Sequence, residues 1–305
     1  MAESFCRVGD IEICLETFGD PDDPALLLIM GLGTQMLGWH EEFCADLAGR
    51  GFHVIRYDNR DIGRSTILDG FPTPTVGQLV RRDKRAAAYT LAEMAGDGVG
   101  VLDHLDVDRA HVVGVSMGGM IAQTIAARRP ERVSSLTSIM SSTGSRWRGQ
   151  PALRTYRKFL RPVAGDRATY IAQTVALFDI IGSPGFDRDD DDLRDLLGAM
   201  YDRGHYPAAV SRQLAAIIAS GNRTGELHRI TAPTLVIHGT ADRLVALSGG
   251  RATARAIPGA RLLKIEGMGH DLPRGAWPQL IDAIVENAGR ARSPAAAPAA
   301  GLLPA

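Results

Sequence analysis

The segment Gly114-Val115-Ser116-Met117-Gly118 decides the fold of this chain, because it has the form G-x-S-x-G. In that pattern a serine occupies a sharp turn between a strand and a helix, and the small residues on either side let neighbouring backbone come close. The context agrees, since β-branched residues precede the motif and a helical pattern follows it, ending at Pro130. We therefore predict that Ser116 lies on a strand-to-helix turn, as a nucleophile. A chance Gly/Ser turn is the alternative.

Strand patterns and helix patterns alternate on both sides of this motif. The chain opens with two short strand patterns separated by Gly9-Asp10, which predict an antiparallel pair. Thr90 and Glu93 have the spacing of a capping box at the start of a helix. The alternation of the two element types predicts an α/β fold, with a mostly parallel sheet flanked by helices. The predicted strands are 5–8, 11–18, 25–30, 53–58, 110–115, 133–140, 234–238 and 261–265; the helices between them include 41–49, 90–105, 117–128, 248–257 and 277–288.

The strand patterns stop after Thr143 and resume only beyond residue 227. The intervening segment reads as several helices, rich in Ala, Leu and Arg and broken by Gly, Pro and Asp. We therefore expect a core made of residues 1–143 and 228–291, with a helical cap of residues 144–227 inserted between two strands. Residues 292–305 are rich in Pro and Ala, and we expect them to form a disordered tail.

A serine hydroxyl needs a base to remove its proton. His270 is our candidate, because it follows the last predicted strand in the glycine-rich loop Gly267-Met268-Gly269, from which it can reach the same edge of the sheet. The other seven histidines lie at strand ends, on a helix or in segments without such a loop. Asp242, in the loop after the strand 234–238, is the expected carboxylate partner of that base. Asp271 is expected to point away into solvent.

An acyl-transfer site also needs hydrogen-bond donors for the developing oxyanion. The backbone N–H of Met117 is one candidate, since this residue follows the nucleophile. The second is the N–H of Leu32, in the Gly31-Leu32-Gly33 loop that follows the strand 25–30. The Gly-x-Gly pattern lacks the third glycine or the lysine of a phosphate-binding loop. The polar stretch 58–65 is expected to form a structural network near the site.

Composition excludes several other classes of function. The chain has 305 residues, 45% hydrophobic and 23% charged, with a formal net charge of −1, so no general positive field favours nucleic acid as a partner. The apolar run 25–30 is too short to span a membrane and the start lacks a signal-peptide pattern, so a cytoplasmic protein is expected. The three cysteines suggest neither a disulfide framework nor a metal site. The acidic run 187–192 fits a helix N-terminus better than a calcium loop.

With these motifs identified, the chain resembles the α/β-hydrolase superfamily, from about residue 5 to residue 288 outside the cap. Within it, several stretches are similar to the aclacinomycin methylesterases and related actinobacterial esterases. The resemblance implies a cofactor-free hydrolase with Ser116, Asp242 and His270 as its triad. Met30 stands where a histidine commonly precedes the oxyanion glycine. The similar stretches are DPALLL at 23–28, LGW at 37–39, HVIRYD at 53–58 and DRAHVVG at 108–114.

These observations favour a serine hydrolase that cleaves carboxylic esters of small to medium hydrophobic compounds through an acyl-enzyme, with a small-molecule ester as its partner and no metal or cofactor. A methylesterase or lactonase of polyketide-type metabolism, a carbon–carbon bond hydrolase and a perhydrolase would use the same triad. A ligand-binding protein on a hydrolase scaffold is the alternative from outside the enzymes.

Overall fold

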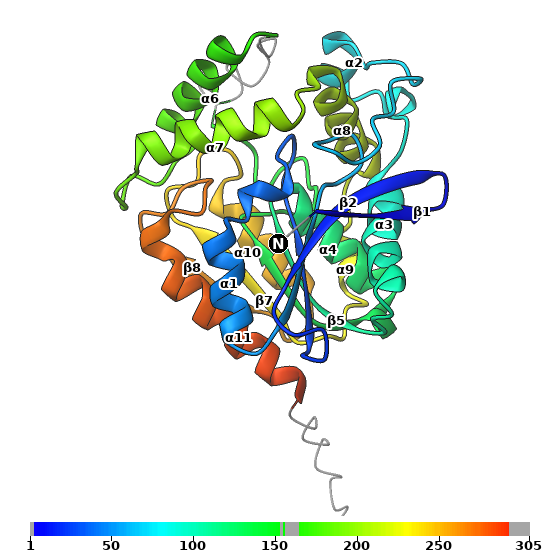
Figure 1. Ribbon diagram of the computed structural model, residues 1–305, viewed down its shortest axis with the longest axis vertical. Helices are drawn as coiled ribbons and strands as arrows, with labels where there is room; N and C mark the ends of the chain where they lie inside the picture. Colours follow the sequence, from blue (N-terminus) through cyan, green and yellow to red (C-terminus); the bar gives the residue numbers. More distant parts are fainter. Residues whose placement is uncertain (1–2, 153–154, 156–164, 293–305) are drawn as a thin grey trace, which may run out of the picture.

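The computed structural model describes residues 3–152, 155 and 165–292, and over these it contains a sheet of eight strands in the order β1-β2-β4-β3-β5-β6-β7-β8 (Figure 1). Strand β2 is antiparallel to β1 and to β4, and every other pair is parallel. The predicted α/β class and its mostly parallel sheet are confirmed. The strands are β1 Ser4–Val8, β2 Ile11–Phe18, β3 Ala25–Ile29, β4 His53–Tyr57, β5 Ala110–Val115, β6 Val133–Ile139, β7 Thr234–Gly239 and β8 Arg261–Ile265.

The side chains of the central strands alternate between two apolar clusters, one on each face of the sheet. From β3, Leu26 and Leu28 pack with α1 (Glu41–Gly49) and α11 (Trp277–Arg292), whereas Leu27 and Ile29 pack on the opposite face. That opposite face is covered by α3 (Leu91–His104), α4 (Met117–Arg128) and the end of α10 (Leu247–Ala256). Burial on both faces explains why these strands appear in the sequence as continuous apolar runs.

Two helix starts follow from their capping residues. The Thr90 side chain accepts from the backbone at the start of α3 while Glu93 reaches back to the Thr90 N–H, as the capping-box spacing predicted. In the acidic run, the Asp189 carboxylate accepts the N–H groups of Asp191 and Asp192, and the helix α7 (Asp190–Arg203) begins there. This confirms that the acidic run is a helix N-terminus, where negative charge is favourable.

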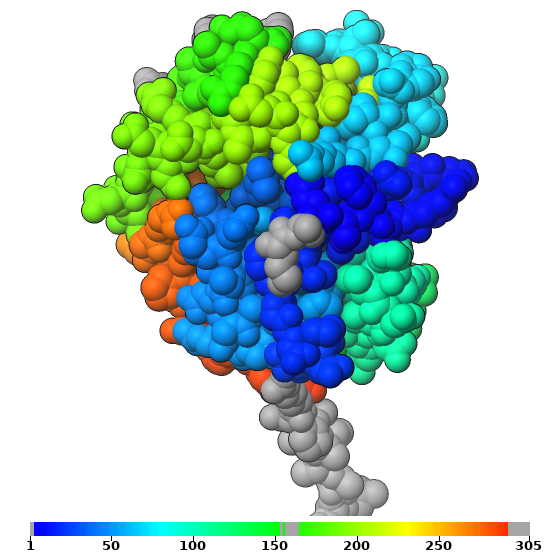
Figure 2. Space-filling view, viewed as in Figure 1, coloured from blue at the N-terminus to red at the C-terminus, as the bar shows by residue number. Residues whose placement is uncertain are grey.

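Among the described residues between β6 and β7, the three longest helices lie over one end of the sheet, and we call them the helical insertion: α6 (Arg167–Ile181), α7 and α8 (Pro207–Ser220) (Figure 1). Figure 2 shows this layer continuing into the cyan segment that carries α2 (Val76–Val80), and α2 packs against α8. The shorter elements are α9 Thr224–Leu227, η1 Met36–Gly38, η2 Lys84–Ala86, η3 Pro130–Arg132 and η4 Arg274–Ala276. The predicted tail lies, from residue 293 onward, outside the described residues.

Buried ion pairs connect the helical insertion to the polar stretch that follows β4. The Arg203 guanidinium, at the end of α7, pairs with the buried carboxylate of Asp58. Arg212 of α8 pairs with the buried carboxylate of Asp61. The expectation that residues 58–65 form a structural network is therefore confirmed, and the network holds the insertion over the sheet.

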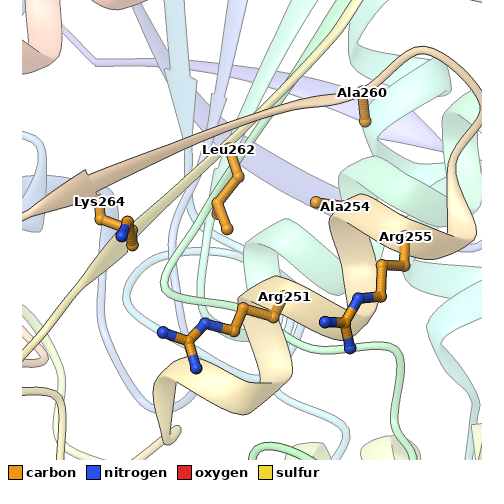
Figure 3. A pocket seen from close by; sticks show the side chains of 6 residues that line it. All are labelled: Arg251, Ala254, Arg255, Ala260, Leu262 and Lys264. Atoms are coloured by element: carbon orange, nitrogen blue, oxygen red, sulfur yellow. The ribbon is translucent and has the colours of Figure 1, made fainter.

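Strand β8 forms the edge of the sheet farthest from β1, so it has a neighbouring strand on one side only. Figure 3 shows Arg251 and Arg255 of α10 and Lys264 of β8 around a shallow hollow at Leu262. None of these three cations forms an ion pair with an acidic residue in the described part of the chain. Positive charge beside an open edge disfavours pairing with a strand of another molecule. Across the described ranges, no helix is both long enough and apolar enough to cross a membrane.

Candidate active site

The turn between β5 and α4 holds Ser116 in a conformation that few residues other than glycine adopt, with φ 55° and ψ −115°. Its backbone is fixed by a 2.9 Å hydrogen bond from the Ser116 N–H to the Ile139 carbonyl. A Cβ on Gly118 would lie 2.1 Å from the Ile29 carbonyl oxygen, and one on Gly114 would lie 2.1 Å from the Gly118 carbonyl oxygen. The glycines of the motif are thus required because backbone approaches them on both sides of the serine.

The structure brings Ser116, His270 and Asp242 together, although they lie in three separate loops. The Nε2 atom of His270 is 3.0 Å from the Ser116 Oγ, and its Nδ1 atom is 2.7 Å from the Asp242 Oδ2. An ionised carboxylate only accepts hydrogen bonds, so Nδ1 carries the proton and Nε2 is left to accept from the serine hydroxyl. This is the tautomer that a general base requires at this position.

The Asp242 carboxylate is fully enclosed, and its turn fixes its orientation. Its Oδ1 atom accepts the N–H groups of Leu244 and Val245 at 2.9 and 2.8 Å. Burial on its own would raise the pKa of Asp242, but the adjacent imidazoles of His270 and His238 more than offset this and hold the pKa well below its usual range. Asp242 is therefore ionised wherever His270 could act as a base.

A second histidine, His238, lies beside the same carboxylate, and no role in the site was predicted for it. The Nε2 atom of His238 donates to the Val245 carbonyl at 2.7 Å and lies 3.5 Å from the Asp242 Oδ2. The side chain is buried, and its Nδ1 atom has no hydrogen-bond partner among the described residues. The short separation of His238 and Asp242, four residues apart across one strand end, was the sequence feature that could have indicated this contact.

The loop that carries His270 is held by the helical insertion. The His270 N–H donates to the Ile181 carbonyl at 2.6 Å, and the Gly269 N–H donates to the Ser183 Oγ at 2.8 Å. The same Ser183 hydroxyl donates to the Asp271 carboxylate. The expectation that Asp271 points into solvent is therefore wrong: it packs against the insertion, and burial raises its pKa.

The two predicted oxyanion donors belong to segments that adjoin the serine. Gly31 borders Ser116, since a Cβ on Gly31 would lie 3.3 Å from the Ser116 Cβ. No acceptor among the described residues pairs with the N–H of Leu32, and the N–H of Met117, in the first residue of α4, has none within its helix. The N–H of Gly33, next to Leu32, donates to the Gln213 side chain of α8 at 2.9 Å. Sequence patterns gave no signal for this contact, because it joins segments 180 positions apart.

A cavity of about 960 Å³ opens between these loops and the helical insertion, and Ser116 and His270 both line it. Its walls are mostly apolar, with Met120 and Met140 from the sheet side and Leu177, Leu197 and Leu214 from the three helices. A site of this size and character suits a largely hydrophobic small molecule. In the part of the chain that the structure describes, no group of three or more His, Cys, Asp and Glu side chains is arranged to hold a metal ion.

Comparison with known proteins identifies the family of the chain and several relatives. Residues 24–273 match the family model described as the alpha/beta hydrolase fold. The chain is 32% identical to the rhodomycin D methylesterase DauP of Streptomyces sp. (strain C5), over 90% of this chain and 94% of that one. It is 31% identical to the rhodomycin D methylesterase DnrP of Streptomyces peucetius, with the same coverage. The crystal structure of the enol-lactonase from Burkholderia xenovorans LB400 superposes with a TM-score of 0.71 at 22% identity, covering 93% of this chain and 99% of that chain.

Proposed function

The chain belongs to the alpha/beta hydrolase family and is a carboxylic ester hydrolase, and on that premise we propose that it cleaves hydrophobic esters through an acyl-enzyme on Ser116. The observation that carries the proposal is the continuous hydrogen-bonded chain from the Ser116 Oγ through both nitrogens of His270 to Asp242. A chain of this kind activates a serine hydroxyl and stabilises the imidazolium that forms when the proton is transferred.

In the proposed reaction, the Ser116 Oγ attacks the ester carbonyl while His270 Nε2 takes its proton. The carbonyl oxygen becomes an oxyanion, for which the N–H groups of Leu32 and Met117 are the proposed donors. His270 then protonates the departing alcohol, and the acyl group remains on Ser116 as an ester. A water molecule, deprotonated by the same imidazole, releases the acid and restores the serine.

We further propose that residues 144–227 act as a cap that shapes the substrate pocket. Support comes from the cavity walls, since all three helices of the insertion contribute apolar side chains to them. The likeness to rhodomycin D methylesterases favours a second, narrower candidate: hydrolysis of a methyl ester whose bulk lies in the acyl group. The volume of about 960 Å³ is large enough for such an acyl group.

The test is hydrolysis of p-nitrophenyl esters of increasing acyl length by the wild-type protein and by Ser116→Ala. Ser134→Ala serves as the control, because Ser134 lies on β6 away from the site. We expect turnover in the wild type and the control, and its loss in Ser116→Ala. The wild-type rate should also fall at acidic pH, because a protonated imidazole cannot accept the serine proton. Absence of turnover in a folded wild-type protein would favour the ligand-binding alternative.

A pair of isomeric esters distinguishes the narrower candidate. Methyl 2-naphthylacetate has its bulk in the acyl group, whereas 2-naphthylmethyl acetate has it in the alcohol. A methylesterase should prefer the first isomer in kcat/KM, and a preference for the second would contradict that specificity while leaving the serine mechanism intact.

A further inference from the structure

The loop after β3 forms a tight turn whose geometry is well defined. The Thr34 N–H donates to the Gly31 carbonyl at 3.3 Å, which closes a four-residue turn. Gly33, the third residue of the turn, has φ +66°, and Leu32, the second, is not among the residues with positive φ. This combination defines a type II turn. A type I turn with the same ends would have the peptide group between Leu32 and Gly33 rotated by roughly half a turn.

That central peptide group is held by one side chain from the helical insertion. The Gly33 N–H donates to the Gln213 Oε1 at 2.9 Å, and the Gln213 Nε2 donates to the Arg60 carbonyl at 2.8 Å. The Gln213 side chain is fully buried, so neither bond competes with water. Because one end of the amide meets a donor and the other an acceptor, its orientation is fixed. Val210, one turn earlier on α8, packs against the Gly33 Cα, where a Cβ would lie 3.2 Å from its Cγ1.

We propose that Gln213 is a positioning residue for the oxyanion site, an inference that rests on the proposed function. The N–H of Leu32 belongs to the peptide group adjoining the one that Gln213 holds. If the Gly33 N–H lost its bond to Gln213, the whole turn would be free to shift away from α8, and the Leu32 N–H would move with it. By holding the turn in place against α8, Gln213 keeps the Leu32 N–H directed at the oxyanion that forms beside Ser116. The helical insertion would thus contribute to transition-state stabilisation as well as to the pocket wall.

The variant Gln213→Met tests this, because it keeps the length of the side chain and removes both hydrogen bonds. Gln123→Met is the matched control, since Gln123 is also a fully buried glutamine on a helix. Its two side-chain partners, Ser138 and Arg223, lie outside the loop after β3. Both variants should lose stability. Misdirecting one oxyanion donor should lower kcat by about 10- to 100-fold, somewhat less than removing it, with KM within about twofold of wild type. Gln123→Met should keep the wild-type kcat.

Inhibitor binding separates positioning from general structural damage. An aryl trifluoromethyl ketone forms an oxyanion-bearing adduct with the serine, whereas the corresponding trifluoromethyl alcohol fills the same cavity without one. In Gln213→Met the affinity for the ketone should fall by the same factor as kcat/KM, and the alcohol should bind as tightly as it does to wild type. Equal weakening of both inhibitors would overturn the proposal, and so would a kcat no lower than that of Gln123→Met.

Gln213→Glu provides a second readout if the methionine variant folds poorly. A protonated carboxyl can replace the amide bond for bond, whereas the ionised form would place a negative oxygen against the Arg60 carbonyl. We expect the ratio of this variant's kcat to the wild-type kcat to be highest at low pH. The ratio should fall as the carboxyl ionises with rising pH. A pH profile of the wild-type shape would contradict the proposal.

A wild type without Ser116-dependent turnover would overturn the proposed function and this inference together, whereas failure in the variants alone would overturn only the inference.

Discussion

Arg212 of α8 donates to both carboxylate oxygens of Asp61, at 2.9 and 2.7 Å, and both side chains are at most 3% exposed. The same carboxylate accepts from the Tyr89 hydroxyl and from the Leu68 N–H. Arg212 is next to Gln213 in the sequence, so two adjacent side chains attach α8 to the polar stretch after β4 and to the loop after β3. This connection joins the insertion to the core through two neighbouring residues of α8.

Removing the cation from this pair should be costly. Arg212→Met leaves the Asp61 carboxylate buried without a counterion, and we expect a loss of about 3–5 kcal/mol in the free energy of unfolding. Adding Asp61→Asn to Arg212→Met should recover part of that loss, because the remaining buried group is then neutral. Urea unfolding of the two single variants and the double variant measures both effects. A loss below about 1 kcal/mol in Arg212→Met would show that the pair contributes no more than a surface ion pair.

The steric account of the serine turn predicts opposite effects for two glycine-to-alanine changes. Gly118→Ala would place a Cβ 2.1 Å from the Ile29 carbonyl oxygen, and we expect it to cost about 3 kcal/mol or more and to abolish turnover. Gly96→Ala is the control, because Gly96 lies on α3 with open space around it. Alanine there should stabilise the protein by roughly 0.5–1 kcal/mol. Thermal unfolding measures both, and a tolerated Gly118→Ala would contradict the account.

Asp271 should make stability depend on pH, with a sign set by its raised pKa. Its carboxyl holds its proton more tightly in the folded than in the unfolded chain. As pH rises, the unfolded chain therefore ionises first, and stability falls until the pH passes the folded-state pKa. Asp271→Asn should consequently be more stable than wild type at neutral pH, and the difference should shrink below about pH 4, near the unfolded value for aspartate.

Asp166 supplies the opposite case, because its pKa is lowered by hydrogen bonds from Thr169 at the start of α6. Its contribution to stability is present at neutral pH and is lost on acidification, so Asp166→Asn should be less stable than wild type at pH 7. Denaturation measured at several pH values compares the two variants. An Asp271→Asn variant less stable than wild type at pH 7 would contradict the burial of Asp271.

The elements of the fold could be predicted from the sequence because each depends on local patterns. The apolar runs of β3 to β7 and the capping box at Thr90 were sufficient to place these strands and α3 to within a residue, whereas α11 extends four residues beyond its predicted end at residue 288. The predictions for Ser116, His270 and Asp242 used loop positions after strands, and the structure brings these three side chains within hydrogen-bond distance. Their catalytic roles stay predictions until they are measured.

Apart from the contact of His238 with Asp242, the contacts that the sequence did not reveal join distant segments. Gln213 meets Gly33, and Ser183 meets both Gly269 and Asp271, only because the helical insertion folds back over the end of the sheet. Helix patterns predict which residues share a face, but they do not fix which loop that face will meet. Asp271 was assigned to solvent for this reason: its neighbours come from a segment whose position no local pattern encodes.

The most direct test of the central claim is covalent labelling with a fluorophosphonate, followed by peptide mass spectrometry. Trypsin should release residues 110–128 as one peptide, in which Ser116 is the only serine. We predict a single adduct on Ser116, none in Ser116→Ala, and labelling of His270→Ala slowed by at least about 10³-fold, as expected when a triad member is removed. An adduct on another residue, or equal labelling of wild type and His270→Ala, would contradict the assignment of Ser116 as a nucleophile activated by His270.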